Sequence, residues 1–118
     1  MHFDLVTPCA HCPFRRKHGC RVGSARAREI GSMMLSSQGA TFTCHQTARS
    51  LGHRGTEQHC AGALIFAELH GTATQPMRWA ERLRIYNRDR LMRPARKQVH
   101  ASVFSSLDDF IAAQREQL

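Results

Sequence analysis

The sequence predicts an α+β fold, a small and helix-rich single domain with short strands. Its length of 118 residues is enough for one domain with a modest core. Apolar residues recur at steps of three and four in several segments, whereas strand-like runs are short. Only 42% of the residues are hydrophobic, so an added cross-link through the five cysteines is expected to staple the core.

The first half of the chain is expected to hold two short strands and one helix. Residues 3–7 alternate weakly and predict a strand, and residues 41–43 predict a second one. Between them, Ser24 is a suitable N-cap for a helix that Gly39 would end. Its apolar stripe consists of Ala27, Ile30, Met33 and Met34. The loop 46–58 lacks an apolar pattern, and we expect it to be mobile or to face a ligand.

The second half is expected to be mainly helical. A buried helix should begin at Cys60 and continue through the apolar run 63–67. Pro76 suits the start of a third helix, which Pro94 would end. Val99 to Phe104 predict a strand or an extended connector. A last helix follows Ser106, whose spacing to Asp109 is that of a capping box with Asp in place of Glu: Ser106, Leu107, Asp108, Asp109.

All five cysteines lie between residues 9 and 60. Cys9 and Cys12 form a C-x2-C pair, and Cys44 and Cys60 form a C-x15-C pair after a gap of 31 residues. The first pair places two sulfurs on one turn, and the distant cysteines then bring remote segments to the same point. The N-terminus lacks the basic and apolar regions of a signal peptide, so we expect a cytoplasmic protein with reduced thiols. This setting favours metal ligation over disulfides.

The sequence is compatible with two different metal centres at the four-cysteine site. A [4Fe–4S] cluster is favoured, because cysteines from separate elements commonly ligate such clusters and a Cys-Pro step such as Cys12-Pro13 is familiar from them. One structural zinc ion is the alternative, since four thiolates make a closed tetrahedral site. The predicted ligands are the same in both cases: Cys9, Cys12, Cys44 and Cys60.

Three histidines lie beside the predicted ligands. We expect His11, His45 and His59 to donate hydrogen bonds to the thiolates or to be solvated. The alternative is that one of them replaces a cysteine at a zinc site, and His45 is the strongest candidate for that role. Cys20 lies in a basic loop flanked by glycines, and we interpret it as a free thiol.

Three short strings carry a resemblance to a known family: Cys9-Ala10-His11-Cys12-Pro13-Phe14-Arg15, Phe42-Thr43-Cys44-His45 and Cys60-Ala61-Gly62. They resemble a domain-of-unknown-function family of small proteins that is common in phages, prophages and actinobacteria. The resemblance covers about residues 5–66 and implies the same four cysteine ligands, with no counterpart of Cys20. It implies a phage-encoded protein in the host cytoplasm and brings no established activity. The cysteine spacing alone also looks like that of iron–sulfur uracil-DNA glycosylases.

The formal charge of +8 is concentrated in one segment. The stretch from Arg78 to Lys97 contains two acidic residues, Glu81 and Asp89, and eight basic ones: Arg78, Arg82, Arg84, Arg88, Arg90, Arg93, Arg96 and Lys97. Such a surface favours nucleic acid, with Trp79 or Tyr86 available to stack on a base. We therefore divide the single domain 1–118 into a metal-binding part (1–72), a basic Arg-rich segment (73–100) and a C-terminal helix (101–118).

The function predicted from these features is a metal-stabilised regulatory or accessory protein that binds nucleic acid. A module that inhibits or redirects a host protein through its basic surface is the alternative. An iron–sulfur enzyme acting on nucleic acid is less favoured, because four thiolates leave no open coordination position and no phosphate loop or paired carboxylates stand out. The sequence has no apolar run of 18 residues or more, so it predicts no membrane span. The sequence does not indicate an oligomeric state.

Overall fold

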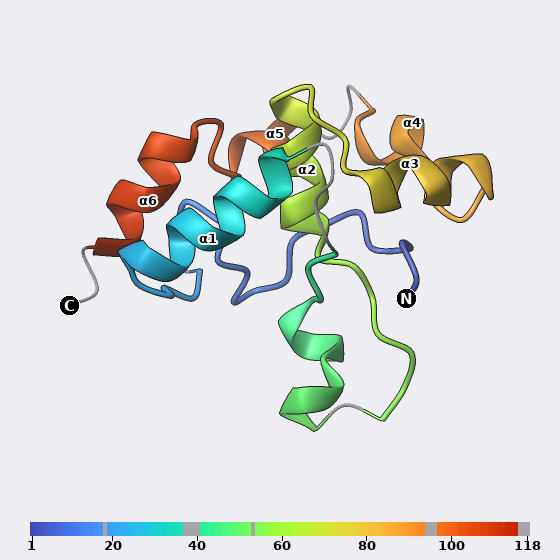
Figure 1. Ribbon diagram of the computed structural model, residues 1–118, viewed down its shortest axis with the longest axis horizontal. Coiled ribbons are helices and arrows are strands. Elements are labelled where there is room, and N and C mark those ends of the chain that lie inside the picture. The colour runs from blue at the N-terminus through green and yellow to red at the C-terminus, as the bar shows by residue number, and fades with distance from the viewer. Residues whose placement is uncertain (18, 37–40, 53, 94–96, 116–118) are drawn as a thin grey trace.

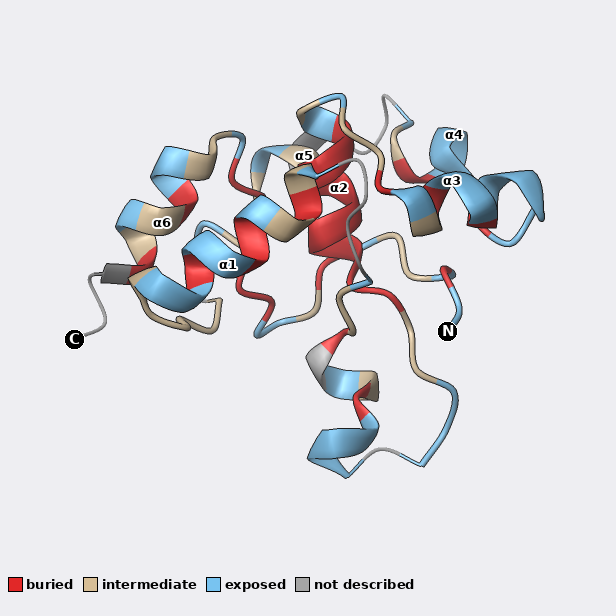
Figure 2. Cartoon of the chain, viewed as in Figure 1, coloured by how far each residue is buried: buried red, intermediate tan, exposed pale blue. Residues whose placement is uncertain are grey.

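Helix α2 (Ala61–Leu69) forms the centre of the molecule, and every residue from Ala61 to Glu68 is buried (Figure 2). Its middle, residues 63–67, is apolar on all sides, and a helix without a polar face is stable only when neighbours enclose it. Its N-cap is Cys60, so the predicted helix that begins at this cysteine is confirmed.

The other helices surround α2 on two sides. Helices α1 and α6 pack against each other on one side, and α1 also contacts α2 (Figure 1). Helices α3 and α4 lie at the opposite end. The bounds are α1 (Ser24–Leu35), α3 (Gln75–Arg82), α4 (Arg88–Leu91), α5 (Lys97–Ala101) and α6 (Leu107–Arg115), with 3₁₀ turns η1 (His45–Thr47) and η2 (Arg49–Leu51).

The computed structural model describes residues 1–17, 19–36, 41–52, 54–93 and 97–115, and only the backbone of residues 45, 97, 98 and 115. It measures 41 × 33 × 28 Å. Within these ranges, no helix has the length and apolar content to cross a membrane.

The helix-rich class is confirmed, but the expected strands are reduced to single bridges in the described ranges. Three isolated bridges join segments far apart in sequence: His2 with Gln58, Arg15 with Val103, and Thr43 with His59. In each of these three pairs of segments, the bridge is confined to one residue position on each side. The extended runs of the sequence therefore serve as connectors between helices and cysteines.

Two predicted helix boundaries differ from the observed ones. Ser24 is the first residue of α1 and does not cap it, because Gly23 occupies the N-cap with a φ of 86°. That left-handed backbone suits glycine. The helix ends at Leu35, and the predicted stop at Gly39 lies outside the described residues.

The predicted single helix from Pro76 to Pro94 is wrong, because the chain turns after α3. The N–H groups of Ile85 and Tyr86 both donate to the carbonyl of Ala80, at 2.9 and 3.2 Å. Arg84 takes a left-handed φ of 60° in this turn. The turn directs Tyr86 into the core, which the local apolar pattern does not reveal. Pro76 does begin the helix as predicted, whereas Pro94 lies outside the described residues.

The C-terminal segment begins with a helix where a strand or connector was expected. Helix α5 extends to Ala101, and Val103 then forms an isolated bridge with Arg15. The prediction for Ser106 is confirmed at the start of α6, since its Oγ accepts a hydrogen bond from the N–H of Asp109 at 3.3 Å.

Three fully buried phenylalanines join the first cysteine pair to the helices. The rings of Phe14 and Phe110 stack with centroids 4.7 Å apart, and Phe14 and Phe66 lie 5.0 Å apart. Phe14 follows Cys12 by two residues. Burial of its ring therefore anchors the cysteine pair between α2 and α6.

Candidate metal centre and basic surface

The pair Cys9 and Cys12 lies on one tight turn. The N–H of Cys12 donates to the carbonyl of Cys9 at 3.1 Å, and the N–H of Arg15 donates to the carbonyl of Cys12 at the same distance. Consecutive turns of this kind bring the two sulfurs to the same side of the backbone. We call residues 9–15 the knuckle.

The second pair, Cys44 and Cys60, lies at the two ends of a loop, and backbone hydrogen bonds hold these ends together. The N–H of Cys44 donates to the carbonyl of Gln58 at 2.8 Å, and the N–H of Cys60 donates to the carbonyl of Phe42 at 2.7 Å. Between these bonds, residues 45–52 and 54–57 extend away from the helices (Figure 1). The spacing C-x15-C is thus the length of a loop whose two ends lie side by side.

The four predicted ligands meet in the structure. The sulfurs of Cys12 and Cys60 are 3.3 Å apart, and Cys9 lies near enough to Cys12 and Cys44 for their thiols to influence one another electrostatically. The sulfurs therefore form a row in the order 44, 9, 12, 60. Cys12, Cys44 and Cys60 are buried, Cys9 is partly exposed, and none of them forms a disulfide.

The environment of the row favours protonated thiols. Hydrogen bonding to Cys12 and then burial raise the pKa of Cys9, and the hydrogen bond to Cys60 is the main cause that raises the pKa of Cys12. Burial raises the pKa of Cys44. Neighbouring thiolates repel each other at low local dielectric, so they need a bound cation to become ionised together.

The donor chemistry fits a metal, although the row is not arranged as a coordination sphere. Among the described residues, no group of three or more His, Cys, Asp or Glu side chains is placed to hold one ion. Four adjacent sulfurs are nevertheless the donor set of both zinc and iron–sulfur sites. The separation of 3.3 Å between Cys12 and Cys60 is slightly below the spacing of about 3.8 Å for thiolates on one tetrahedral zinc.

Two glycines allow the backbone to approach the cysteines, and the ligand prediction did not include them. A Cβ on Gly62 would lie 2.4 Å from the sulfur of Cys12 and 3.7 Å from that of Cys60. A Cβ on Gly19 would lie 2.3 Å from the carbonyl oxygen of Cys12. The available sequence signal for the first was Cys60-Ala61-Gly62, where glycine follows the last ligand in the first turn of α2.

His59 is fully buried and bonds to the backbone. The N–H of Phe42 donates to its Nε2 at 3.3 Å, and its Nδ1 lies 3.1 Å from the carbonyl of Cys60, which assigns the proton to Nδ1. Burial lowers its pKa to about 4, which keeps the ring neutral. The ring therefore links the two ends of the 45–57 loop.

The other residues near the knuckle occupy different environments. His11 is exposed, and the side chain of His45 lies outside the described part of the structure. Cys20 donates its N–H to the carbonyl of His11 at 3.0 Å, but its sulfur lies against the carbonyl of Arg21 at 3.9 Å. The structure thus places Cys20 beside the knuckle and outside the row of four sulfurs.

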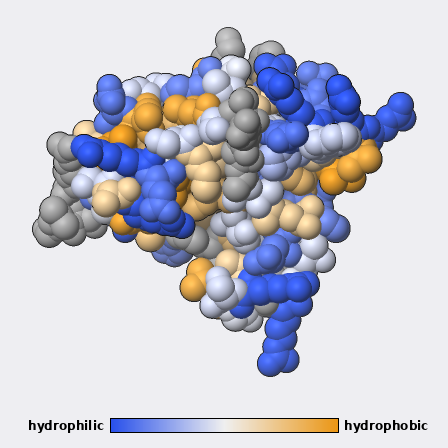
Figure 3. All heavy atoms as spheres, in the orientation of Figure 1, coloured by the Kyte–Doolittle hydropathy of each residue, from blue (hydrophilic) through white to orange (hydrophobic). Residues whose placement is uncertain are grey.

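The predicted nucleic-acid residues are mostly on the surface at the α3–α4 end. Figure 3 shows hydrophilic and apolar atoms side by side over this end of the molecule. The exposed arginines are Arg78, Arg82, Arg84, Arg88, Arg90 and Arg93. We call them, with Trp79, the arginine surface. Arg96 and the side chain of Lys97 lie outside the described residues.

Two members of this segment are already engaged within the protein. The Nε of Arg88 hydrogen-bonds to Oε2 of Glu68, a carboxylate that is almost completely buried. Tyr86 donates its hydroxyl to Oε1 of Glu68 at 3.2 Å and is only 4% exposed. Trp79, by contrast, is 56% exposed and lies under the guanidinium of Arg82, 5.9 Å from the ring centroid. Of the two predicted stacking residues, Trp79 is the accessible one.

Comparison with known proteins identifies the family and not an activity. No curated protein and no solved structure matches the chain. The model of a family of unknown function, DUF6283, matches residues 5–118. This range includes the knuckle, Cys44, Cys60 and the arginine surface, and the chain therefore belongs to the DUF6283 family.

Proposed function

We propose that this protein is a metal-stabilised nucleic-acid-binding protein with a regulatory or accessory role. One observation supports the proposal: four cysteines from distant positions in the sequence lie near one another, and three of them are buried. The metal would hold the N-terminal part together, and the arginine surface at the other end would contact phosphates. The resemblance noted above favours a phage-encoded protein.

The proposed ligands are Cys9, Cys12, Cys44 and Cys60. A [4Fe–4S] cluster is supported by ligands that come from separate segments and by the Cys12-Pro13 step. One zinc ion is supported by the closeness of the Cys12 and Cys60 sulfurs, because irons at the corners of a cluster hold their thiolates further apart. Either centre would cross-link segments that otherwise pair at single bridges.

Metal analysis of protein purified without oxygen tests this part. Iron and sulfide with a brown colour would identify a cluster, and one zinc per colourless chain would identify the alternative. Protein that folds fully in the presence of a strong chelator, and that retains no metal when it is purified gently, would overturn the metal centre.

The nucleic-acid part is supported by exposed guanidiniums that have no described acidic partner close by: Arg78, Arg82, Arg84, Arg90 and Arg93. Phosphate contacts release counterions, so affinity should fall linearly with salt on a logarithmic plot. Replacing Arg78 and Arg82 by Gln should reduce that slope by about two. The matched control is Arg28→Gln on α1, which removes an exposed charge from the other side. Absence of binding at low salt would rule the proposal out.

A host-protein partner is the second candidate, and one observation favours it. Leu83 is 66% exposed and Ile85 is 49% exposed beside the arginines. Exposed apolar side chains within a charged rim are common at protein interfaces. Capture from host lysate with and without nuclease separates the candidates, since a bridging nucleic acid is lost on digestion.

A further inference from the structure

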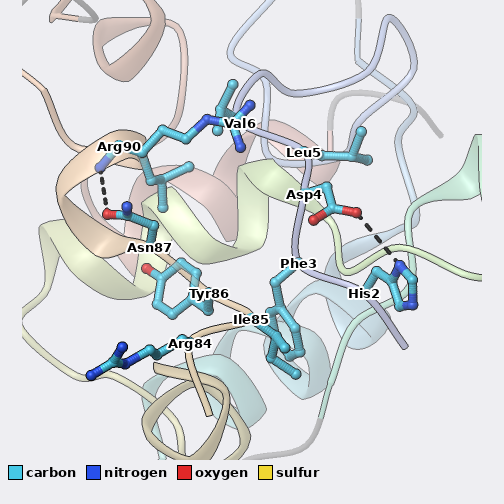
Figure 4. A pocket seen from close by; sticks show the side chains of 11 residues that line it. His2, Phe3, Asp4, Leu5, Val6, Arg84, Ile85, Tyr86, Asn87 and Arg90 are labelled. Atoms are coloured by element: carbon cyan, nitrogen blue, oxygen red, sulfur yellow. Dashed lines mark hydrogen bonds and ion pairs between the residues drawn. The ribbon is translucent and has the colours of Figure 1, made fainter. Parts of the chain in front are cut away.

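The turn between α3 and α4, residues 83–87, has an inner side and an outer side. On the inner side, a pocket of about 390 Å³ lies between this turn and residues 2–6 (Figure 4). Phe3 and Tyr86 are buried there with their ring centroids 5.9 Å apart, so these two rings belong to the core. The side chain of Arg84 extends away from the pocket lining (Figure 4). The groups that a large ligand can reach therefore lie on the outer side.

The outer side carries a cluster of exposed apolar side chains. Of the six large apolar side chains that are exposed in the described part of the chain, three lie close together in sequence: Trp79, Leu83 and Ile85. The N–H of Leu83 donates to the carbonyl of Trp79 at 3.0 Å, so Leu83 continues the last turn of α3 and lies beside Trp79 on one face. Exposed apolar side chains that cluster, and do not occur singly, mark interaction sites.

Arginines border these apolar side chains. Arg78 and Arg82 are four residues apart and are therefore neighbours on α3. The guanidinium of Arg82 lies 5.9 Å from the centroid of the Trp79 ring. Glu81 is also exposed, but it is two positions from Trp79, a spacing that directs the two side chains to different faces. The face that we call the tryptophan face therefore attracts an anion, and it consists of Arg78, Trp79, Arg82 and Leu83.

A single-stranded nucleic acid matches both the charged and the apolar part of this face. Its phosphates pair with guanidiniums, and its bases are free to stack on an indole ring. Arg82 beside the ring adds a planar cation that favours the same kind of stacking. A duplex also offers phosphates to the arginines. Its bases, however, are already stacked on each other, so the ring of Trp79 would stay uncovered.

We propose that the tryptophan face binds single-stranded nucleic acid, with one base stacked on Trp79 and the neighbouring phosphates on Arg78 and Arg82. This inference rests on the proposed function and specifies its substrate class, a single strand in preference to a duplex. Stacking uses the flat face that every base has, so the site tolerates different sequences. Trp79 is the residue that distinguishes a strand from a duplex, whereas the two arginines contribute to both.

Trp79 supplies a direct readout, because it is the single tryptophan of the chain. The test titrates the protein as purified with a single-stranded DNA oligonucleotide of mixed sequence, an RNA strand of the same sequence and the matching DNA duplex. A base that stacks on the indole quenches its fluorescence, so a single strand should quench Trp79 and the duplex should not. The strand should also bind more tightly than the duplex at the same salt concentration. Stronger quenching by one of the two strands identifies the polymer as DNA or RNA.

Two substitutions at Trp79 separate stacking from apolar contact. Trp79→Leu keeps an apolar side chain and removes the aromatic ring, so affinity for a labelled single strand should fall about tenfold, the loss expected for one base–aromatic stack. Affinity for the duplex should change by less than about threefold, because phosphate contacts do not use the ring. Trp79→Phe keeps an aromatic ring and should recover most of the lost affinity. Since Trp79 is more than half exposed, both variants should keep the melting temperature of the wild type.

Two results would overturn the inference and leave the proposed function intact. One is a duplex that binds as tightly as the strand. The other is a loss in Trp79→Leu no larger than in the control Arg28→Gln, with a salt slope that still depends on Arg78 and Arg82. If neither strand nor duplex binds at low salt, the proposed function fails and the inference fails with it. If no strand quenches Trp79, but a host protein captured after nuclease treatment is lost in Leu83→Ala, the face is a protein interface and the inference is wrong.

Discussion

Gly62 lies so close to Cys12 that a Cβ on the glycine would be 2.4 Å from the cysteine sulfur. The same Cβ would be 3.1 Å from the Cβ of Phe14, which is itself fully buried. The first turn of α2 and the knuckle are therefore in direct contact, with room for a hydrogen atom and not for a methyl group. The position of the row of sulfurs depends on this contact.

Gly62→Ala should displace Cys12 and lower metal occupancy. The clash is with a buried sulfur, and overpacking of this kind costs about 1–3 kcal/mol in addition to the distorted ligand set. Metal content per folded chain and the urea unfolding midpoint measure the two effects. Gly31→Ala is the matched control, because its Cβ would meet the flexible end of Leu107 at 2.3 Å, away from the sulfurs. Full metal loading in Gly62→Ala would contradict the proposed site.

Serine substitutions should separate the four ligands from the fifth cysteine. Cys12→Ser and Cys60→Ser should each lose most of the bound metal and unfold at lower denaturant concentration, since metal binding contributes folding free energy. Cys20→Ser should keep its metal, because the Cys20 sulfur lies against the Arg21 carbonyl. A chelator titration followed by circular dichroism provides the measurement. Equal loss of metal in Cys20→Ser would mean that the ligand set is wrong.

Features with a local cause were predictable from the sequence. The start of α2 at Cys60, the place of Pro76 and the cap at Ser106 each depend on a few neighbouring residues. The four cysteines that the spacing singled out lie near one another in the structure, and their role as ligands stays a prediction. Local chemistry determines turns, caps and pairs of cysteines on one turn, and these are the features that residue patterns encode.

Features with a distant cause were not predictable. The helix expected to reach Pro94 ends at Arg82 because Tyr86 turns inward to Glu68, a residue 18 positions away. The role of Gly62 depends on a sulfur from another segment, and the pocket joins the N-terminus to residue 84 and beyond. In each case a tertiary contact overrides a local preference, and the residue pattern shows only one partner.

Arg88→Gln should destabilise the fold more than an equal change elsewhere on the arginine surface. Arg88 pairs with the buried carboxylate of Glu68, whereas Arg78 is exposed on α3. Because the Arg88 side chain is 52% exposed, the expected loss is about 1–2 kcal/mol, below that of a fully buried pair. Urea unfolding of Arg88→Gln and Arg78→Gln provides the comparison. Equal stability of the two variants would show that the ion pair contributes nothing measurable.

Tyr86 should make the protein less stable at alkaline pH. Burial is the main cause that raises the pKa of its hydroxyl, followed by the charge and hydrogen bond of Glu68 and the charge of Glu81, while Arg88 acts in the opposite direction. In the unfolded chain the hydroxyl loses its proton near pH 10. Above that pH the unfolded state binds fewer protons than the folded state, so stability falls as pH rises, by up to about 1.4 kcal/mol per pH unit.

The effect can be isolated because Tyr86 is the single tyrosine of the chain. Tyrosinate absorbance should appear together with the loss of helical circular dichroism and not before it. Tyr86→Phe keeps the ring against Phe3 and removes the ionisable group, so the steep alkaline slope of its unfolding free energy should flatten. The thiols are present in both proteins, and their titration cancels in this comparison. Tyrosinate absorbance that rises near pH 10 while the circular dichroism stays native would show that the hydroxyl is not held by Glu68.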